Sequence, residues 1–103
     1  MTKQTVTISP DVIRTVVRNT VLAMPSVRGL VDSERRLGSR GYQGVEVRLG
    51  DNAVGVSLHV LAAADAPLVE LGRQIQDEVV SVVEEIVGMK VASVDVAFED
   101  VKA

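Results

Sequence analysis

The sequence has no cysteine and no tryptophan, and its 103 residues include only one histidine. The absence of cysteine excludes disulfides, thiolate catalysis and cysteine-ligated metal. One histidine is a poor basis for a zinc site, which usually takes several ligands from His and Cys. We therefore expect neither a metal nor a cofactor.

Long apolar runs are also missing. No run approaches the roughly 20 residues of a membrane span, and the opening Met-Thr-Lys-Gln-Thr lacks the apolar core of a signal peptide. We expect a cytoplasmic protein, so any membrane association requires a partner. The formal net charge of -3 argues against bulk attraction to nucleic acid or anionic lipid.

What the sequence has in abundance is valine, within a hydrophobic content of 47%. A chain of this length and composition fits one folded domain with one core rich in β-branched residues. We expect a single domain over residues 1–103, with frayed tails at 1–3 and 101–103. Residues 28–43, rich in Arg and Gly, have no clear period and predict a mobile loop.

Two stretches have apolar residues at helical spacing. The first begins after Ser9, a good N-cap followed by Pro10, and runs to about Met24. The second covers 68–87 and ends at Gly88, with Asp65 as an expected cap. The predicted buried faces are Ile13, Val16, Val17, Thr20, Val21 and Met24 in the first helix, and Leu68, Leu71, Ile75, Val79, Val82 and Ile86 in the second.

Period-two alternation predicts four strands, at 5–8, 44–49, 54–60 and 92–98, with a hairpin turn at 50–52. The expected order is β-α-β-β-α-β. The simplest packing is an α+β fold with a single layer of mostly antiparallel or mixed four-stranded sheet and two helices on one face, as in ferredoxin-like domains.

The other face of this sheet would carry Ser57, His59 and Asp95. A catalytic triad is one interpretation, but a flat strand supplies neither an oxyanion hole nor a strained nucleophile turn. A solvated sheet face is the better interpretation. Because several neighbouring residues are small, this face could also accept another protein.

The loop contains Gly38-Ser39-Arg40-Gly41, which matches the GxxG pattern of KH domains, beside Arg35 and Arg36. In KH domains that pattern joins two helices, whereas here a strand follows. Nucleic-acid contact through the loop is a lesser alternative, which the acidic net charge disfavours.

Charge also lines the predicted helices. Glu70, Asp77 and Glu84 recur every seven residues on the second helix, and Arg14 and Arg18 lie four apart on the first. These faces are either ordinary solvated surface, with an arginine pairing to Glu70 or Asp77, or surfaces of opposite charge that steer a partner. The candidate interaction residues are Glu70, Asp77, Glu84, Arg14, Arg18, Ser57, His59 and Asp95.

Several segments together resemble the alkaline shock protein family of envelope stress response proteins: 6–13 (VTISPDVI), 25–30 (PSVRGL), 75–79 (IQDEV), 83–91 (VEEIVGMKV) and 94–96 (VDV). Val87 and Asp95 depart from the family's frequent Thr and Asn. The resemblance implies a non-enzymatic cytoplasmic stress response protein, associated with the membrane through an anchored partner and able to self-associate. It supplies no catalytic residue.

Two hypotheses follow. The first is an interaction or scaffold module that binds a membrane-anchored protein. The alternative is a small regulatory ligand-binding domain of ferredoxin-like type, for which fold analogy is the only support.

Overall fold

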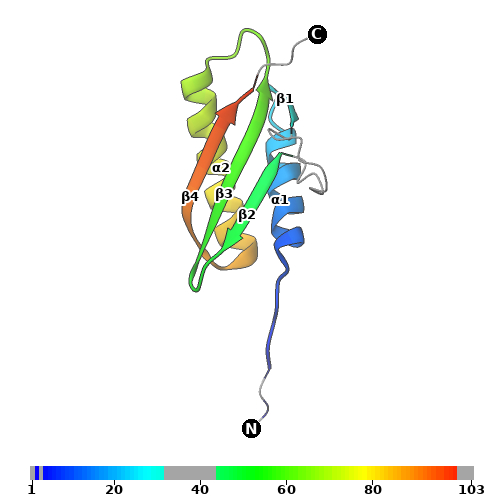
Figure 1. Cartoon of the computed structure of the whole chain (residues 1–103), viewed down its shortest axis with the longest axis vertical. Helices are drawn as coiled ribbons and strands as arrows, with labels where there is room; N and C mark the ends of the chain where they lie inside the picture. Colours follow the sequence, from blue (N-terminus) through cyan, green and yellow to red (C-terminus); the bar gives the residue numbers. More distant parts are fainter. Residues whose placement is uncertain (1, 3, 32–43, 100–103) are drawn as a thin grey trace, which may run out of the picture.

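The computed structural model describes residue 2 and residues 4–31 and 44–99. Within them, two helices pack on one face of a four-stranded sheet (Figure 1). The elements in chain order are α1 (Pro10–Leu22), β1 (Val27–Leu30), β2 (Val45–Leu49), β3 (Ala53–Ala62), α2 (Leu68–Val87) and β4 (Lys90–Phe98). The predicted α+β class, with both helices on one face of a mixed sheet, is confirmed.

Strand β3 is the centre of the sheet. Strand β4 runs parallel to it on one side, while β1 and β2 are both antiparallel to it on the other. Because β2 pairs with Val54–Leu58 and β1 with Val60–Ala62, β1 and β2 lie end to end. The residue between them on β3 is His59. Its carbonyl accepts from the Val31 N–H at 3.0 Å, and its N–H donates to the Gly44 carbonyl at 2.9 Å.

The chain therefore leaves the sheet at Val31 and returns at Gly44, beside the same residue of β3. The prediction of a mobile loop over 28–43 was wrong at its start, because residues 28–30 belong to strand β1. Residues 32–43, and with them the GxxG pattern, lie outside the described residues.

The strand predicted at residues 5–8 is not formed. Residues 5–8 form no helix or strand, and Val6 is 87% exposed. The fourth strand of the sheet is instead β1, so the order is α-β-β-β-α-β. Alternation shows that a segment can be a strand, but a strand also needs a partner edge. Val27 obtains one by pairing with Ala62, and its side chain is buried.

The buried stripe of α2 is Leu71, Ile75, Val79 and Val83, at strict four-residue spacing. Rows of every fourth residue are inclined to the helix axis, which lets the helix cross a twisted sheet. The predicted stripe was correct in its middle but wrong at its ends. Leu68 is 45% exposed and Ile86 57% exposed, and Val82 is only half-buried.

The predicted hairpin is confirmed: β2 and β3 are antiparallel, and the Gly50 N–H donates to the Ala53 carbonyl at 2.8 Å. In β4 the predicted inward alternation fails at Ala92. Val91 pairs with Val54 and Ser93 with Gly55, so Ala92 is the extra residue of a bulge and is exposed.

The start of α1 and the end of α2 were predicted correctly from residues near each end. Ser9 is the N-cap of α1, in an extended conformation with Pro10 next, although its side chain makes no capping hydrogen bond. Gly88 ends α2 in the left-handed conformation, with φ 74°. The N-cap of α2 is Pro67, not Asp65 as expected, and α1 ends at Leu22, short of Met24. In the described part of the chain, no helix combines the length and apolarity needed to cross a bilayer.

Candidate interaction surfaces

In the described part of the chain, no helix covers the second face of the sheet, which is turned to the viewer in Figure 1. We call it the outer face. Its residues come from three adjacent strands: Glu46 and Arg48 from β2, Gly55, Ser57 and His59 from β3, and Ser93, Asp95 and Ala97 from β4. The register aligns them in rows across the strands, with Glu46, Ser57 and Asp95 in one row. Four of these eight residues are small, so the described part of this face is shallow: Gly55, Ser57, Ser93 and Ala97.

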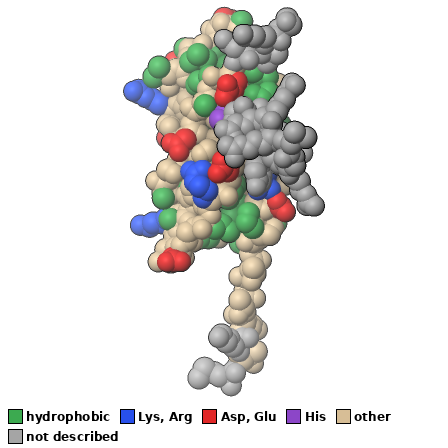
Figure 2. Space-filling view, viewed as in Figure 1, with side chains coloured by type: hydrophobic (Ala, Val, Ile, Leu, Met, Phe, Trp, Pro, Cys, Tyr) green, Lys and Arg blue, Asp and Glu red, His purple; other side chains and the backbone are tan. Residues whose placement is uncertain are grey.

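Arg48 makes the central contacts of the outer face. Its Nη1 donates to Ser57 Oγ at 2.9 Å and lies 3.5 Å from Glu46 Oε1, and its Nη2 lies 3.8 Å from Asp95 Oδ2. Gly55 leaves room for it, since a Cβ there would lie 3.1 Å from Nη2. These four interacting residues, Glu46, Arg48, Ser57 and Asp95, are the Arg48 cluster. Charged side chains of both signs gather on this face in Figure 2.

The Arg48 cluster is a poor source of stability. The Arg48 side chain is 46% exposed and that of Asp95 74%. Exposed ion pairs typically contribute about 0–1 kcal/mol. What the cluster does provide is a positioned guanidinium on an otherwise flat surface.

The predicted triad residues share the outer face but are not arranged for catalysis. The Ser57 hydroxyl contacts the Arg48 guanidinium, which is a cation and not a base. His59 Nδ1 lies 2.9 Å from Glu99 Oε1, so its carboxylate neighbour is Glu99, not Asp95. Among the described residues, no group of three or more His, Asp or Glu side chains could hold a metal ion.

The acidic residues of α2 form a different surface. Glu70, Asp77 and Glu84 are exposed, on the side of the helix turned away from the buried stripe. Since α2 lies behind the sheet, this surface and the outer face are on opposite sides of the molecule (Figure 1). Glu84 also has a local role, because its Oε2 accepts a hydrogen bond from the Val91 N–H at 3.1 Å.

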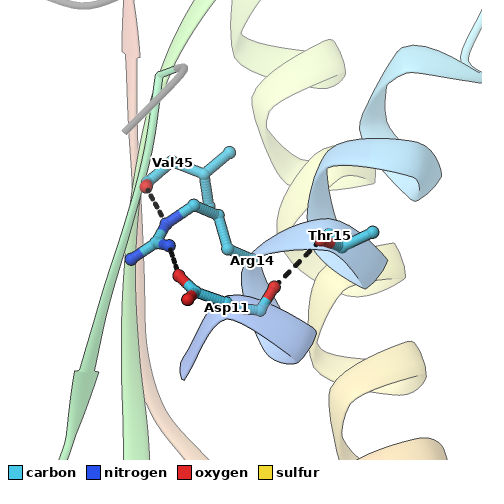
Figure 3. Close-up of polar contacts among 4 residues, drawn as sticks. All are labelled: Asp11, Arg14, Thr15 and Val45. Carbon is cyan, nitrogen blue, oxygen red and sulfur yellow. Dashed lines mark hydrogen bonds and ion pairs between the residues drawn. The ribbon is translucent and has the colours of Figure 1, made fainter. Parts of the chain in front are cut away.

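The arginines of α1 are not on the solvated side where the helical pattern predicted them. Arg14 has a side chain only 19% exposed and forms an ion pair with Asp11. Its Nε donates to the Val45 carbonyl at 3.2 Å, so its guanidinium lies against β2 (Figure 3). The Nε of Arg18 is buried, with no hydrogen-bond partner among the described residues. The expected pairing with Glu70 or Asp77 is absent from this part of the chain.

The eight predicted interaction residues thus fall on separate surfaces. Sequence analysis selected Ser57 and Asp95 of this face but not Glu46 and Arg48, which complete the Arg48 cluster. The available signal was the small residue Gly55 between polar neighbours on adjacent strands, which can be recognised only once the register is known.

Comparisons with known proteins agree with this fold. The sequence model of the alkaline shock protein family, described by its cell envelope-related function, matches residues 1–103. No curated protein shows significant sequence similarity to the chain.

Among solved structures, the zinc form of a MamM CTD variant is 14% identical and has a TM-score of 0.56, over 90% of this chain and 87% of that one. MamM CTD itself is 14% identical, with a TM-score of 0.56 over 88% of this chain and 98% of that one. A cadmium form of another variant is 15% identical, with a TM-score of 0.56 over 89% and 96%. At these identities the likeness shows a shared fold, and the metals belong to those structures.

Proposed function

The chain belongs to the alkaline shock protein family, and from this premise we propose that it is a non-enzymatic protein-interaction module of the cell envelope stress response. The proposed site of partner binding is the outer face, with Arg48 at its centre. The observation that carries the proposal is that, among the described residues, no helix or strand covers the outer face, where one guanidinium is held by three neighbouring side chains.

The geometry supports binding in two ways. Arg is enriched among residues that dominate interface energies, and its planar fork suits bidentate recognition of carboxylates. The contacts to Ser57, Glu46 and Asp95 restrict the side chain before a partner arrives, which reduces the entropy cost of ordering it. A partner surface with a carboxylate facing Arg48 and basic groups facing Glu46 and Asp95 would fit.

Membrane association, in this proposal, comes through a membrane-anchored partner on the cytoplasmic side. The net charge of -3 and the exposed Glu70, Asp77 and Glu84 would repel anionic headgroups. Direct binding to the lipid surface is therefore the weaker explanation.

The test begins with affinity purification of the tagged full chain from gently solubilised membranes, followed by mass spectrometry. The protein captured is then purified and its affinity for the chain measured. We expect Arg48→Glu to weaken binding by at least about tenfold, because truncating or reversing a hot-spot residue costs more than 1.4 kcal/mol. The matched control is the triple variant Glu70→Lys, Asp77→Lys and Glu84→Lys, which also changes charge but on the opposite side.

Binding that survives Arg48→Glu in a folded protein and is lost in the triple variant would place the site on α2 and contradict the proposal. The regulatory ligand-binding alternative stays a prediction; a thermal-shift screen of amino acids and nucleotides would support it by a rise in Tm.

A further inference from the structure

The chain has an extended segment with the sequence pattern of a strand that pairs with no other strand among the described residues. Residues 4–9 leave the start of α1 and run away from the body of the molecule (Figure 1). Thr5 to Ile8 alternate polar and apolar β-branched side chains, which are suited to a half-buried strand. Val6 is nevertheless 87% exposed, and only Ile8 packs against the core.

The sheet has an edge with the complementary property. The Gly50 N–H donates to Ala53 and the His59 N–H to Gly44, so alternate residues of β2 face β3. By this alternation, the N–H and C=O groups of Val45, Val47 and Leu49 point away from β3. Arg14 Nε binds the Val45 carbonyl. The outward groups of Val47 and Leu49 have no partner within the described residues, and the Leu49 side chain is 44% exposed.

The opposite edge is better protected. Gln76 Nε2 donates to the Val94 carbonyl of β4 at 3.0 Å, and Glu84 accepts from the Val91 N–H. Such side-chain contacts block an edge strand against pairing with another chain. The extended segment also starts on the β2 side, because α1 packs against β1 and β2.

From these observations we infer that residues 4–8 of one copy add as a strand to the β2 edge of a second copy, along Val47 to Leu49. Val6 would then lie on the helix side of the sheet, beside Val47 and Leu49, and the threonines on the outer face. Five extended residues span about 17 Å, which is more than the open part of β2 requires. Strand addition would bury Val6 and supply partners for the outward groups of both segments.

The first test is sedimentation velocity of the full chain over a wide range of concentrations. We expect reversible self-association that weakens at least about tenfold in the double variant Val6→Pro with Thr7→Pro. Adjacent residues of a strand point their N–H groups to opposite sides, so one of the two prolines removes an N–H that faces β2. The matched variant exchanges two neighbours, Val6→Thr with Thr7→Val. It keeps the composition but moves the apolar side chain to the other face, and should weaken association similarly. Circular dichroism melting of the dilute monomers should be unchanged.

The second test locates the contact, using the absence of native cysteine. A tagged Val6→Cys copy is mixed with an untagged Leu49→Cys copy under mild oxidation. Side chains on neighbouring strands are close enough for a disulfide. We expect the mixed disulfide in preference to one with Val96→Cys, a position on the β4 edge.

A monomer at every concentration, association unaffected by both segment variants, or preferential disulfide formation with Val96→Cys would each overturn the inference. So would an intramolecular disulfide in the doubly substituted chain at high dilution without any mixed disulfide, because the segment would then fold back on its own sheet. The experiment needs no other protein, so its failure leaves the proposed role of the outer face untouched.

Discussion

Gly44 marks the point where the chain returns to the sheet after residues 32–43. Its φ is 80°, in the left-handed region that glycine tolerates best. An added Cβ would lie 2.8 Å from the Val31 nitrogen and 2.9 Å from Leu30 Cβ, closer than real contacts allow. Glycine is therefore favoured at this position for two reasons: the backbone has a positive φ, and the end of β1 leaves no room for a Cβ.

A paired substitution separates these two requirements. Gly88 has a similar φ of 74°, but nothing lies within 4 Å of the position of its Cβ. We expect Gly88→Ala to lower the free energy of unfolding by about 1 kcal/mol, from backbone strain alone. Gly44→Ala should cost at least about 1 kcal/mol more, because β1 must also move. Urea unfolding at equilibrium would measure both, and equal costs would contradict the clash.

Arg14 shows at the same scale why a residue's environment is hard to predict. Its place in the helical pattern put it on the solvated side of α1. The long side chain instead reaches β2 and binds the carbonyl of Val45, 31 residues away in the sequence. Periodicity describes directions around one helix and contains no information on a neighbouring strand edge.

At the scale of elements, the buried face of α2 differs from the one that the sequence pattern predicted. Val83 is fully buried and Ile86 is 57% exposed, whereas the sequence pattern favoured Val82 and Ile86. We expect Val83→Ala to lower the free energy of unfolding by about 2 kcal/mol, from lost burial and the cavity left behind. Ile86→Ala should change it by less than about 0.5 kcal/mol, although it removes more atoms. Urea unfolding would measure both changes in the free energy of unfolding. A larger loss for Ile86→Ala than for Val83→Ala would mean that the buried stripe of α2 is not inclined.

The strands show a different limit of sequence analysis. The hairpin of β2 and β3 was predicted because both strands alternate and a Gly-Asp-Asn turn joins them. Strand β1 was not predicted, because four residues that include Arg28 and Gly29 are too short for a clear period. Residues 5–8 have the better pattern but pair with no strand in the described part of the chain. The alternation of polar and apolar residues shows only that a segment is suited to a strand. Whether the segment pairs depends on which strand edges of the sheet are free to accept it.

At the scale of the whole molecule, β3 is the strand with neighbours on both sides. We expect its amides from Val54 to Val60 to be the slowest to exchange with deuterium, by global unfolding only. Amides of Gln4 to Ile8 should exchange almost as fast as in an unfolded chain when the protein is dilute. Hydrogen exchange followed by mass spectrometry would measure both, and faster exchange in β3 than in β2 or β4 would contradict this topology.

The inner face of the sheet stabilises the fold, whereas the outer face is the proposed binding surface. The inner face and the helices supply an apolar core: among the described residues, every side chain that is buried as a whole is hydrophobic. The outer face carries the Arg48 cluster, whose contacts contribute little to folding. Substitutions there can therefore be used to test binding in a folded protein.

The sequence by itself determined the two helices, the start of α1 at Pro10, the end of α2 at Gly88, and the hairpin of β2 and β3. All of these depend on periodicity or on conformational preferences within a few residues. The tertiary structure decided that β1 pairs with the end of β3, that Ala92 bulges, that the α2 stripe is inclined and that Arg14 meets Val45. Each of these depends on contacts between segments far apart in the chain, whose free energy is set by the pairing edge and the angle between the layers.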